Sequence, residues 1–238
     1  MTRSEYTDLW SLCVARTEEH PDRVVLDFDG KLWTWAELMD AAKDLAGGLT
    51  AAGVGAGEVV CHMSPNHPEG VVTMLALLRL GAVECPVNAG LRGQQLAHVL
   101  DHSGARVLIV AGSLSDRVDE QLTSAPQVQT VVVRGGGQPP AGVSVLDYEE
   151  LRGSGEKPPP FRPPGPGDPM NIIYTSGTTG PAKGAVLPQA FPIEQARIKI
   201  EQWGLTPDDV MFSALPLYHV NARFSTLGTA LVVDGRAA

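Results

Sequence analysis

The chain has few cysteines and little positive charge, and each shortage argues against particular classes of protein. It carries 18 lysines and arginines against 27 aspartates and glutamates, a net charge of −9. Nucleic acids and anionic membranes attract basic surfaces, so neither is expected as a main partner. The three cysteines are odd in number, far apart and include no CxxC pair, so neither a disulfide framework nor a zinc site is suggested. Cys61 and Cys85 lie in apolar runs typical of strands, which predicts buried free thiols in a reducing cytosol.

Long hydrophobic runs are missing as well. The longest apolar stretch, residues 71–78, is interrupted by Thr73 and followed by Arg79, so it is too short to span a bilayer. The N-terminus lacks the apolar core of a signal peptide. We therefore expect a soluble, cytoplasmic protein with no membrane partner. The hydrophobic residues, 43% of the chain, suffice for a sizeable core.

Apolar runs of strand length alternate with amphipathic segments of helical length along most of the chain. The pattern predicts strands such as 59–63 and 82–87, separated by helices such as 68–80 and 91–102. Asp29-Gly30 predicts a tight hairpin turn between two further strands. Such alternation is typical of an α/β fold, in which layered, parallel-rich sheets carry helices on both faces.

Residues 158–169 stand apart in composition, with seven prolines and two glycines. Proline is excluded from helix and sheet interiors, so this segment is expected to run extended over the surface. We expect it to link an N-terminal α/β subdomain, residues 1–157, to the start of a second α/β subdomain, residues 170–238. In the second part we expect a strand at 210–215 and a buried helix at 220–232.

The most informative stretch is YTSGTTGPAKG at 174–184, directly after an apolar run. Its glycines let the backbone approach a ligand closely, and its N–H groups and hydroxyls, without a carboxylate among them, can form an anion cradle. Lys183 adds a mobile positive charge suited to phosphate oxygens. The candidate phosphate-binding residues are Thr175, Ser176, Gly177, Thr178, Thr179, Gly180 and Lys183.

Runs of glycine, serine and threonine are more often flexible loops. Here the run is flanked by apolar segments of strand character, not by a polar linker, which favours phosphate binding. It is not a Walker A loop, because Ala182 precedes Lys183 and Gly184 follows it.

The segment TSGTTGPAKG resembles the phosphate loop of the adenylate-forming enzymes: acyl-CoA synthetases, luciferases and the adenylation domains of peptide synthetases. The resemblance implies that a carboxylate attacks ATP to give acyl-AMP and pyrophosphate, and that the acyl group then passes to a thiol, with CoA as the expected acceptor. It implies ATP and Mg²⁺ as cofactors, a small-molecule acid as substrate, and Lys183 and Thr179 as catalytic residues. A homodimer is compatible with this interpretation.

A second segment, LPLYHVN at 215–221, resembles a motif of the same superfamily whose histidine and aromatic residue lie near the acyl pocket. The resemblance makes Tyr218, His219 and Asn221 the candidate substrate-pocket residues, with Arg223 a further candidate for substrate contact. The alternative is that His219 merely satisfies the end of a strand. The phosphate loop upstream favours the acyl site.

Two histidine pairs carry weaker signals. His98 and His102 are four residues apart on an expected helix and are interpreted as ordinary helix surface, because zinc would need further ligands. His62 and His67 flank a turn after an expected strand, where α/β sheets bind ligands, although plain loop chemistry explains them equally.

The resemblance runs along the whole chain, and PVNAGLRG at 86–93 looks most like the crotonobetaine/carnitine-type CoA ligases. Members of the family are much longer. The segments that hold adenine, magnesium and ribose are absent here, as are the hinge and the C-terminal domain with its catalytic lysine. We therefore expect a truncated N-terminal portion of a ligase. Two alternatives stay open: a non-catalytic nucleotide-binding remnant, or a relative that adenylates nitrite to diazotise an aryl amine.

Overall fold

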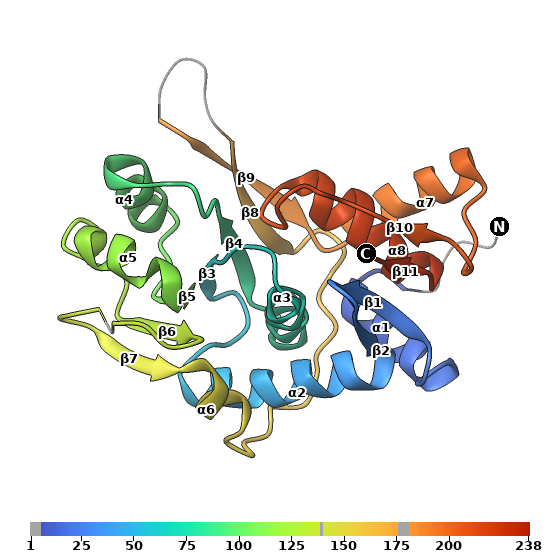
Figure 1. The fold of residues 1–238 in the computed structure, drawn as a ribbon, viewed down its shortest axis with the longest axis horizontal. Coiled ribbons are helices and arrows are strands. Elements are labelled where there is room, and N and C mark those ends of the chain that lie inside the picture. Colours follow the sequence, from blue (N-terminus) through green and yellow to red (C-terminus); the bar gives the residue numbers. More distant parts are fainter. Residues whose placement is uncertain (1–5, 139, 176–180) are drawn as a thin grey trace.

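The computed structural model describes residues 6–138, 140–175 and 181–238. A seven-stranded sheet with the order β7-β6-β5-β3-β4-β8-β9 runs through its middle (Figure 1). All neighbouring strands in it are parallel except β8 and β9, which form an antiparallel hairpin. The strands are β3 (Val59–Met63), β4 (Val83–Val87), β5 (Val107–Ala111), β6 (Thr130–Arg134), β7 (Ser144–Asp147), β8 (Pro169–Thr175) and β9 (Lys183–Pro188).

Helices cover both faces of this sheet. On one face lie α1 (Leu9–Glu19), α2 (Trp35–Ala51) and α3 (Pro68–Leu80), and on the other lie α4 (Gly93–His102) and α5 (Ser115–Leu122) (Figure 1). Successive strand residues alternate between the two sides: Val60 packs in the core under α1–α3, and Cys61 in the core under α4 and α5. Because both faces are buried, the strands read as continuous apolar runs. The expected α/β fold is confirmed.

A smaller sheet, with the order β10-β11-β1-β2, joins the two ends of the described chain. The strands β1 (Val24–Phe28) and β2 (Lys31–Thr34) form a hairpin, and β11 (Arg236–Ala237) pairs in parallel with both β1 and β10 (Val210–Met211). The buried carboxylate of Asp234 accepts a hydrogen bond from the Trp35 indole at 2.7 Å. This bond fastens the C-terminal segment to the start of α2.

Local sequence signals set several element boundaries. At the β1–β2 turn Asp29 and Gly30 both have positive φ, 52° and 81°, as the hairpin prediction requires. Thr34 caps α2 through the expected capping box: its side chain accepts from the Glu37 amide, and the Glu37 carboxylate accepts from the Thr34 amide. Helix α3 ends at Gly81, whose φ of 68° suits a glycine C-cap.

The structure corrects the expectations for the C-terminal part. Of the strand expected at 210–215 the structure forms Val210–Met211, which pairs with β11, and the Ser213 amide donates to the Ala238 carbonyl oxygen beyond it at 3.2 Å. The helix expected at 220–232 is a π-helix, η2 (Asn221–Gly228), followed by α8 (Thr229–Val233). Upstream of them α7 (Phe191–Trp203) forms as expected. Four short elements were not expected: β7, β11, η1 (Gly112–Leu114) and α6 (Tyr148–Arg152).

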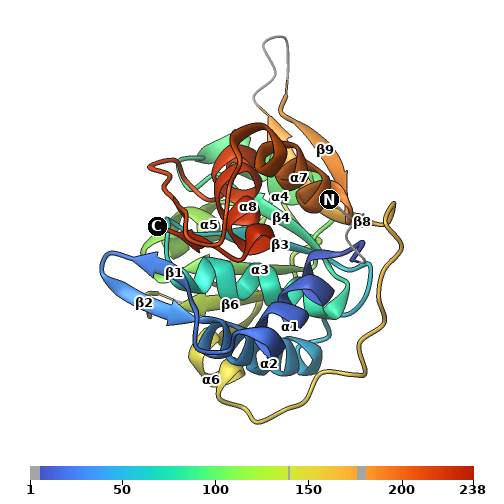
Figure 2. The same cartoon turned by 90° about the vertical axis from the view of Figure 1, so that its right-hand side faces the viewer.

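The proline-rich segment runs along the outside of the molecule between α6 and β8, and its residues 158–168 form neither helix nor strand (Figure 2). Beyond it β8 pairs in parallel with β4, with Asn171 opposite Glu84. Both sheets therefore contain strands from either side of this segment, so strand pairing does not follow the expected division into residues 1–157 and 170–238. That division stays a prediction.

Two further expectations concern the cysteines and membrane-spanning segments. The three cysteines are free and buried, as predicted for Cys61 and Cys85. No helix in the described ranges is long and apolar enough to cross a membrane.

Candidate functional site

A cavity of about 630 Å³ opens at the carboxyl ends of β4 and β8. Its walls come from the ends of these two strands, from α4 and from the segment that leads into η2. Parallel α/β sheets bind ligands at this edge, because the loops that follow the strands converge there. Central lining residues are Val87, Asn88, His98, Tyr174, Thr175, Tyr218 and His219.

Both described ends of the predicted phosphate loop lie at this cavity. Thr175, where β8 ends, and Pro181, after the gap, are lining residues. Lys183 pairs with Thr175 in the β8–β9 ladder and is exposed, and it is not among the lining residues. The candidates Ser176, Gly177, Thr178, Thr179 and Gly180 fall outside the described residues, so their roles stay predictions.

The histidines of α4 hold both strands of the hairpin that carries this loop. The His98 Nε2 lies 2.9 Å from the Ala182 carbonyl oxygen, so this nitrogen must carry the proton. The His102 Nδ1 lies 2.6 Å from the Tyr174 hydroxyl. The pair lies at the surface of α4, as expected, with His102 exposed and His98 half-buried, but its two hydrogen bonds to the hairpin were not expected. The spacing was visible in the sequence, but the partners lie 84 and 72 residues away and only the fold brings them near.

Of the residues predicted for the substrate pocket, Tyr218 and His219 reach the cavity wall, with their rings 4.7 Å apart. Asn66 fixes the turn before them: it donates to the Leu215 carbonyl at 3.1 Å and accepts from the Leu217 amide at 2.7 Å. Asn221 is exposed at the start of η2 and does not line the cavity.

Behind this turn lies a buried polar cluster that the sequence reading missed. Arg223 Nη1 donates to Glu84 Oε2 on β4 at 2.5 Å, and Asn171 Nδ2 donates to the same oxygen at 3.2 Å. His62 Nδ1 lies 3.2 Å from the other carboxylate oxygen, Glu84 Oε1. Arg223 is 3% exposed and Glu84 2%. The Arg223 guanidinium is thus bonded to other residues of the protein, so the prediction that it contacts substrate is corrected. The one hint in the sequence was a carboxylate inside the apolar run GAVECPV.

Electrostatics keep the Glu84 carboxylate ionised. Burial raises its pKa, but the charge of Arg223 and the hydrogen bonds from His62 and Asn171 outweigh burial, so the net pKa lies below the usual value. The cluster therefore presents a fixed negative charge paired with a fixed positive one.

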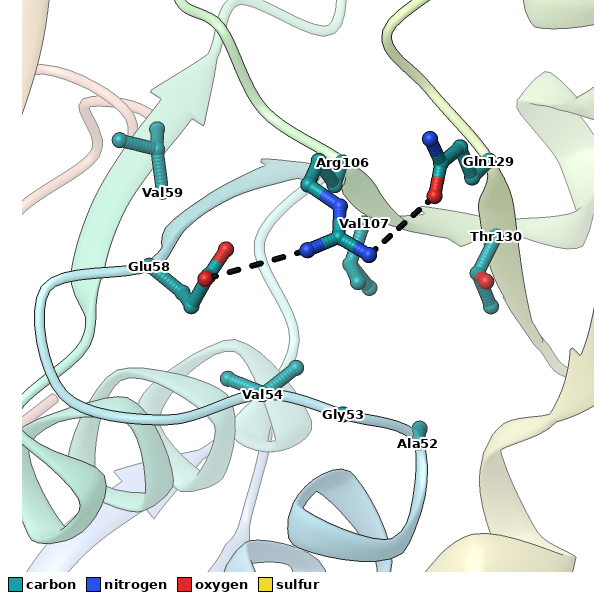
Figure 3. A pocket seen from close by; sticks show the side chains of 9 residues that line it. All are labelled: Ala52, Gly53, Val54, Glu58, Val59, Arg106, Val107, Gln129 and Thr130. Carbon is teal, nitrogen blue, oxygen red and sulfur yellow. Dashed lines mark hydrogen bonds and ion pairs between the residues drawn. The ribbon is translucent and has the colours of Figure 1, made fainter.

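The opposite edge of the sheet holds a much smaller pocket, of about 30 Å³ (Figure 3). It lies where β3, β5 and β6 begin. Arg106 crosses it, donating to the Gln129 side-chain oxygen Oε1 at 3.2 Å and lying 4.0 Å from Glu58. The space accommodates little more than a water molecule, so of these two edges the carboxyl edge holds the candidate site. No group of three histidine, cysteine or carboxylate side chains among the residues with described positions could hold a metal ion.

A parallel-rich sheet with a cavity at its carboxyl edge is typical of ligand-binding α/β enzymes. The model of the AMP-binding enzyme family matches residues 13–236, and the chain belongs to this family. The predicted resemblance is thereby confirmed, while the carnitine-type subgroup stays a prediction.

Named relatives agree. The chain is 33% identical to an indoleacetate–CoA ligase of Aromatoleum aromaticum over 84% of this chain and 38% of the relative. It is also 33% identical to a feruloyl-CoA synthase of an Amycolatopsis species, over 90% of this chain and 40% of the relative. The Mycobacterium smegmatis MbtA structure superimposes on this chain with a TM-score of 0.86 at 30% identity. The match covers 97% of this chain and 43% of MbtA. The chain thus spans about two fifths of the length of these relatives.

Proposed function

We propose that this chain forms the phosphate- and acid-binding part of an ATP-dependent acid–CoA ligase. The observation that carries the proposal is that both ends of the 176–180 loop, Thr175 and Pro181, open on the cavity that Tyr218 and His219 also line. Phosphate and acid would therefore meet at one edge of one sheet. Membership in the AMP-binding family and the CoA ligases among the relatives support this assignment.

In the first proposed step, a carboxylate oxygen attacks the α-phosphorus of ATP. The new oxygen–phosphorus bond gives acyl-AMP, and the bond to the β-phosphate breaks and releases pyrophosphate. In the second step, the CoA thiolate attacks the acyl carbon and AMP leaves. The first step needs positioning and charge stabilisation more than covalent chemistry from the protein.

Within this scheme Lys183 neutralises charge on the departing phosphates, and Thr175 to Gly180 supply backbone and hydroxyl donors, with Thr179 the second catalytic candidate. Magnesium would offset further phosphate charge, but the described residues offer no cluster of ligands for it, so no step is assigned to it.

Tyr218 and His219 are proposed to form one wall for the acid. The cavity lining in the described part of the chain contains no lysine, arginine, aspartate or glutamate. Such a neutral wall suits the uncharged body of an acid better than a second anionic group, because an unpaired charge would be costly to bury there. His98 is not available as a base at Nε2, since that nitrogen donates to Ala182.

The test is ATP–pyrophosphate exchange with aryl, fatty and small carboxylic acids and with nitrite. For a carboxylic acid, Lys183→Ala should slow exchange roughly tenfold to a hundredfold, the value of one hydrogen bond to a charged group. Lys43→Ala is the matched control: this lysine pairs with Asp40 on the surface of α2, away from the cavity, and its loss should leave exchange unchanged.

Other outcomes would redirect the assignment. Unaltered exchange in Lys183→Ala would remove that residue from the mechanism. Exchange with nitrite alone would favour diazotisation chemistry. Binding of ATP without any exchange would favour a non-catalytic nucleotide-binding chain.

A further inference from the structure

Arg223 physically links the centre of the large sheet to the wall of the cavity. Its Nη1 lies 2.5 Å from Glu84 Oε2 on β4, and its Nε donates to the Leu217 carbonyl oxygen at 2.9 Å. Leu217 directly precedes Tyr218 and His219. One planar guanidinium therefore connects a strand to the turn that carries both predicted substrate-pocket side chains, and its fork fixes direction as well as distance.

The strand end of this link is itself fixed. Glu84 is also contacted by His62 of β3 and by Asn171 of β8, each at 3.2 Å, and Asn171 donates in addition to the Glu84 backbone carbonyl at 3.3 Å. All three side chains are at most 7% exposed. Three neighbouring strands thus determine where the carboxylate lies, and through Arg223 they determine where the turn lies.

Stability does not explain why such a cluster is buried. Apolar side chains of similar volume can replace a buried ion pair with no loss of stability and often with a gain, because the desolvation of two charges offsets their attraction. The cluster also includes the π-helix η2, which contains Arg223, and π-turns occur frequently at functional sites. Both observations favour a role in geometry over one in stability.

We propose that Glu84 and Arg223 are positioning residues that hold Tyr218 and His219 in register with the acid. They contact neither reactant and act through the turn at 215–219. The proposal rests on the function proposed above for the cavity.

The decisive variant is Glu84→Leu/Arg223→Met, which removes both charges and retains similar volumes. We expect a thermal midpoint equal to or above that of the wild type. We expect kcat/KM for the acid in pyrophosphate exchange to fall by at least about tenfold, since a displacement near 1 Å can cost about a hundredfold. The KM for ATP should change much less. An unchanged kcat/KM for the acid would overturn the proposal.

Two comparison variants sharpen this result. Arg223→Lys retains the charge opposite Glu84 but cannot also bond Leu217, so it should remain folded and still lose kcat/KM for the acid. Arg106→Gln removes the exposed pair at the other edge of the sheet and should leave kcat/KM unchanged. Full activity in Arg223→Lys would show that charge alone suffices, against a positioning role.

A second readout does not depend on activity. Amide hydrogen exchange over 215–220 should quicken in the double variant, while exchange in β4 stays slow; equal rates at 215–220 would overturn the positioning role. If the wild-type chain catalyses no pyrophosphate exchange, the proposed function fails, and hydrogen exchange still decides the structural claim. Should the double variant not fold, hydrogen exchange over 215–220 in Arg223→Lys tests the positioning role in its place.

Discussion

The two edges of the large sheet are built from the same strands but are chemically different. At the amino edge, Glu58 and Arg106 form an exposed pair, 41% and 59% accessible, over a pocket of about 30 Å³. Further into the sheet, Glu84, the second residue of β4, and Arg223 form a pair about 3% accessible, behind the turn that borders the cavity of about 630 Å³ at the carboxyl edge. The exposed charges keep their hydration, whereas the buried charges depend on each other.

The difference follows from strand direction. In a parallel sheet every strand ends at the same edge, so the segments after β4 and β8 gather there and leave a space between them. The amino edge receives tight connections from the helices, such as the turn at Gly53, where φ is 86°. The Glu58–Arg106 pair is therefore exposed at the amino edge, whereas the Glu84–Arg223 pair is buried behind the cavity. The sharpest experiments alter one pair and use the other as reference.

The largest expected effect comes from breaking the buried pair on one side. Arg223→Met leaves the Glu84 carboxylate buried without its cation, which should cost about 3–5 kcal/mol of unfolding free energy. Urea denaturation measures this loss, and adding Glu84→Leu should restore all of it. A loss below about 1 kcal/mol would mean that water reaches Glu84 and that the two charged pairs are more alike than the structure indicates.

An intermediate effect is expected from acid. The folded-state pKa of Glu84 is lowered, so its stabilising contribution is complete above its unfolded pKa, about 4.3, and is lost as pH falls through the lower folded value. Denaturation below about pH 4 should thus destabilise the wild type more than Glu84→Leu/Arg223→Met. Glu37, whose pKa is lowered chiefly by hydrogen bonds from Thr34, titrates in both proteins and cancels in the difference. Parallel pH curves would contradict the assignment.

The smallest effect is expected at the amino edge. Arg106→Gln removes an exposed ion pair at 4.0 Å and should change the unfolding free energy by no more than about 1 kcal/mol. Added salt should reduce even this difference, because exposed charges are screened. A loss as large as that of Arg223→Met would mean that burial does not distinguish the two pairs.

Features fixed by neighbouring residues were predictable from the sequence. The Asp29-Gly30 turn, the Thr34–Glu37 capping box and the end of α3 at Gly81 each depend on atoms a few residues apart. The strand expected at 210–215 forms only at Val210–Met211, and its partner, β11, lies 26 residues further along the chain, where no local pattern identifies it. Of the candidate site, the sequence indicated Tyr218 and His219 but could not separate them from the exposed Asn221.

By itself, the sequence determined the α/β alternation, the family motif at 174–184 and the local caps and turns, since these arise from side-chain type and short-range hydrogen bonds. Only the tertiary structure decided that His98 would bond Ala182 and that Glu84 would meet Arg223, 139 residues away. Both contacts require β8 to pair with β4 after the proline-rich segment. The reason is physical: a buried charge is tolerated only where the fold supplies its partners, and no local pattern specifies which distant residue that will be.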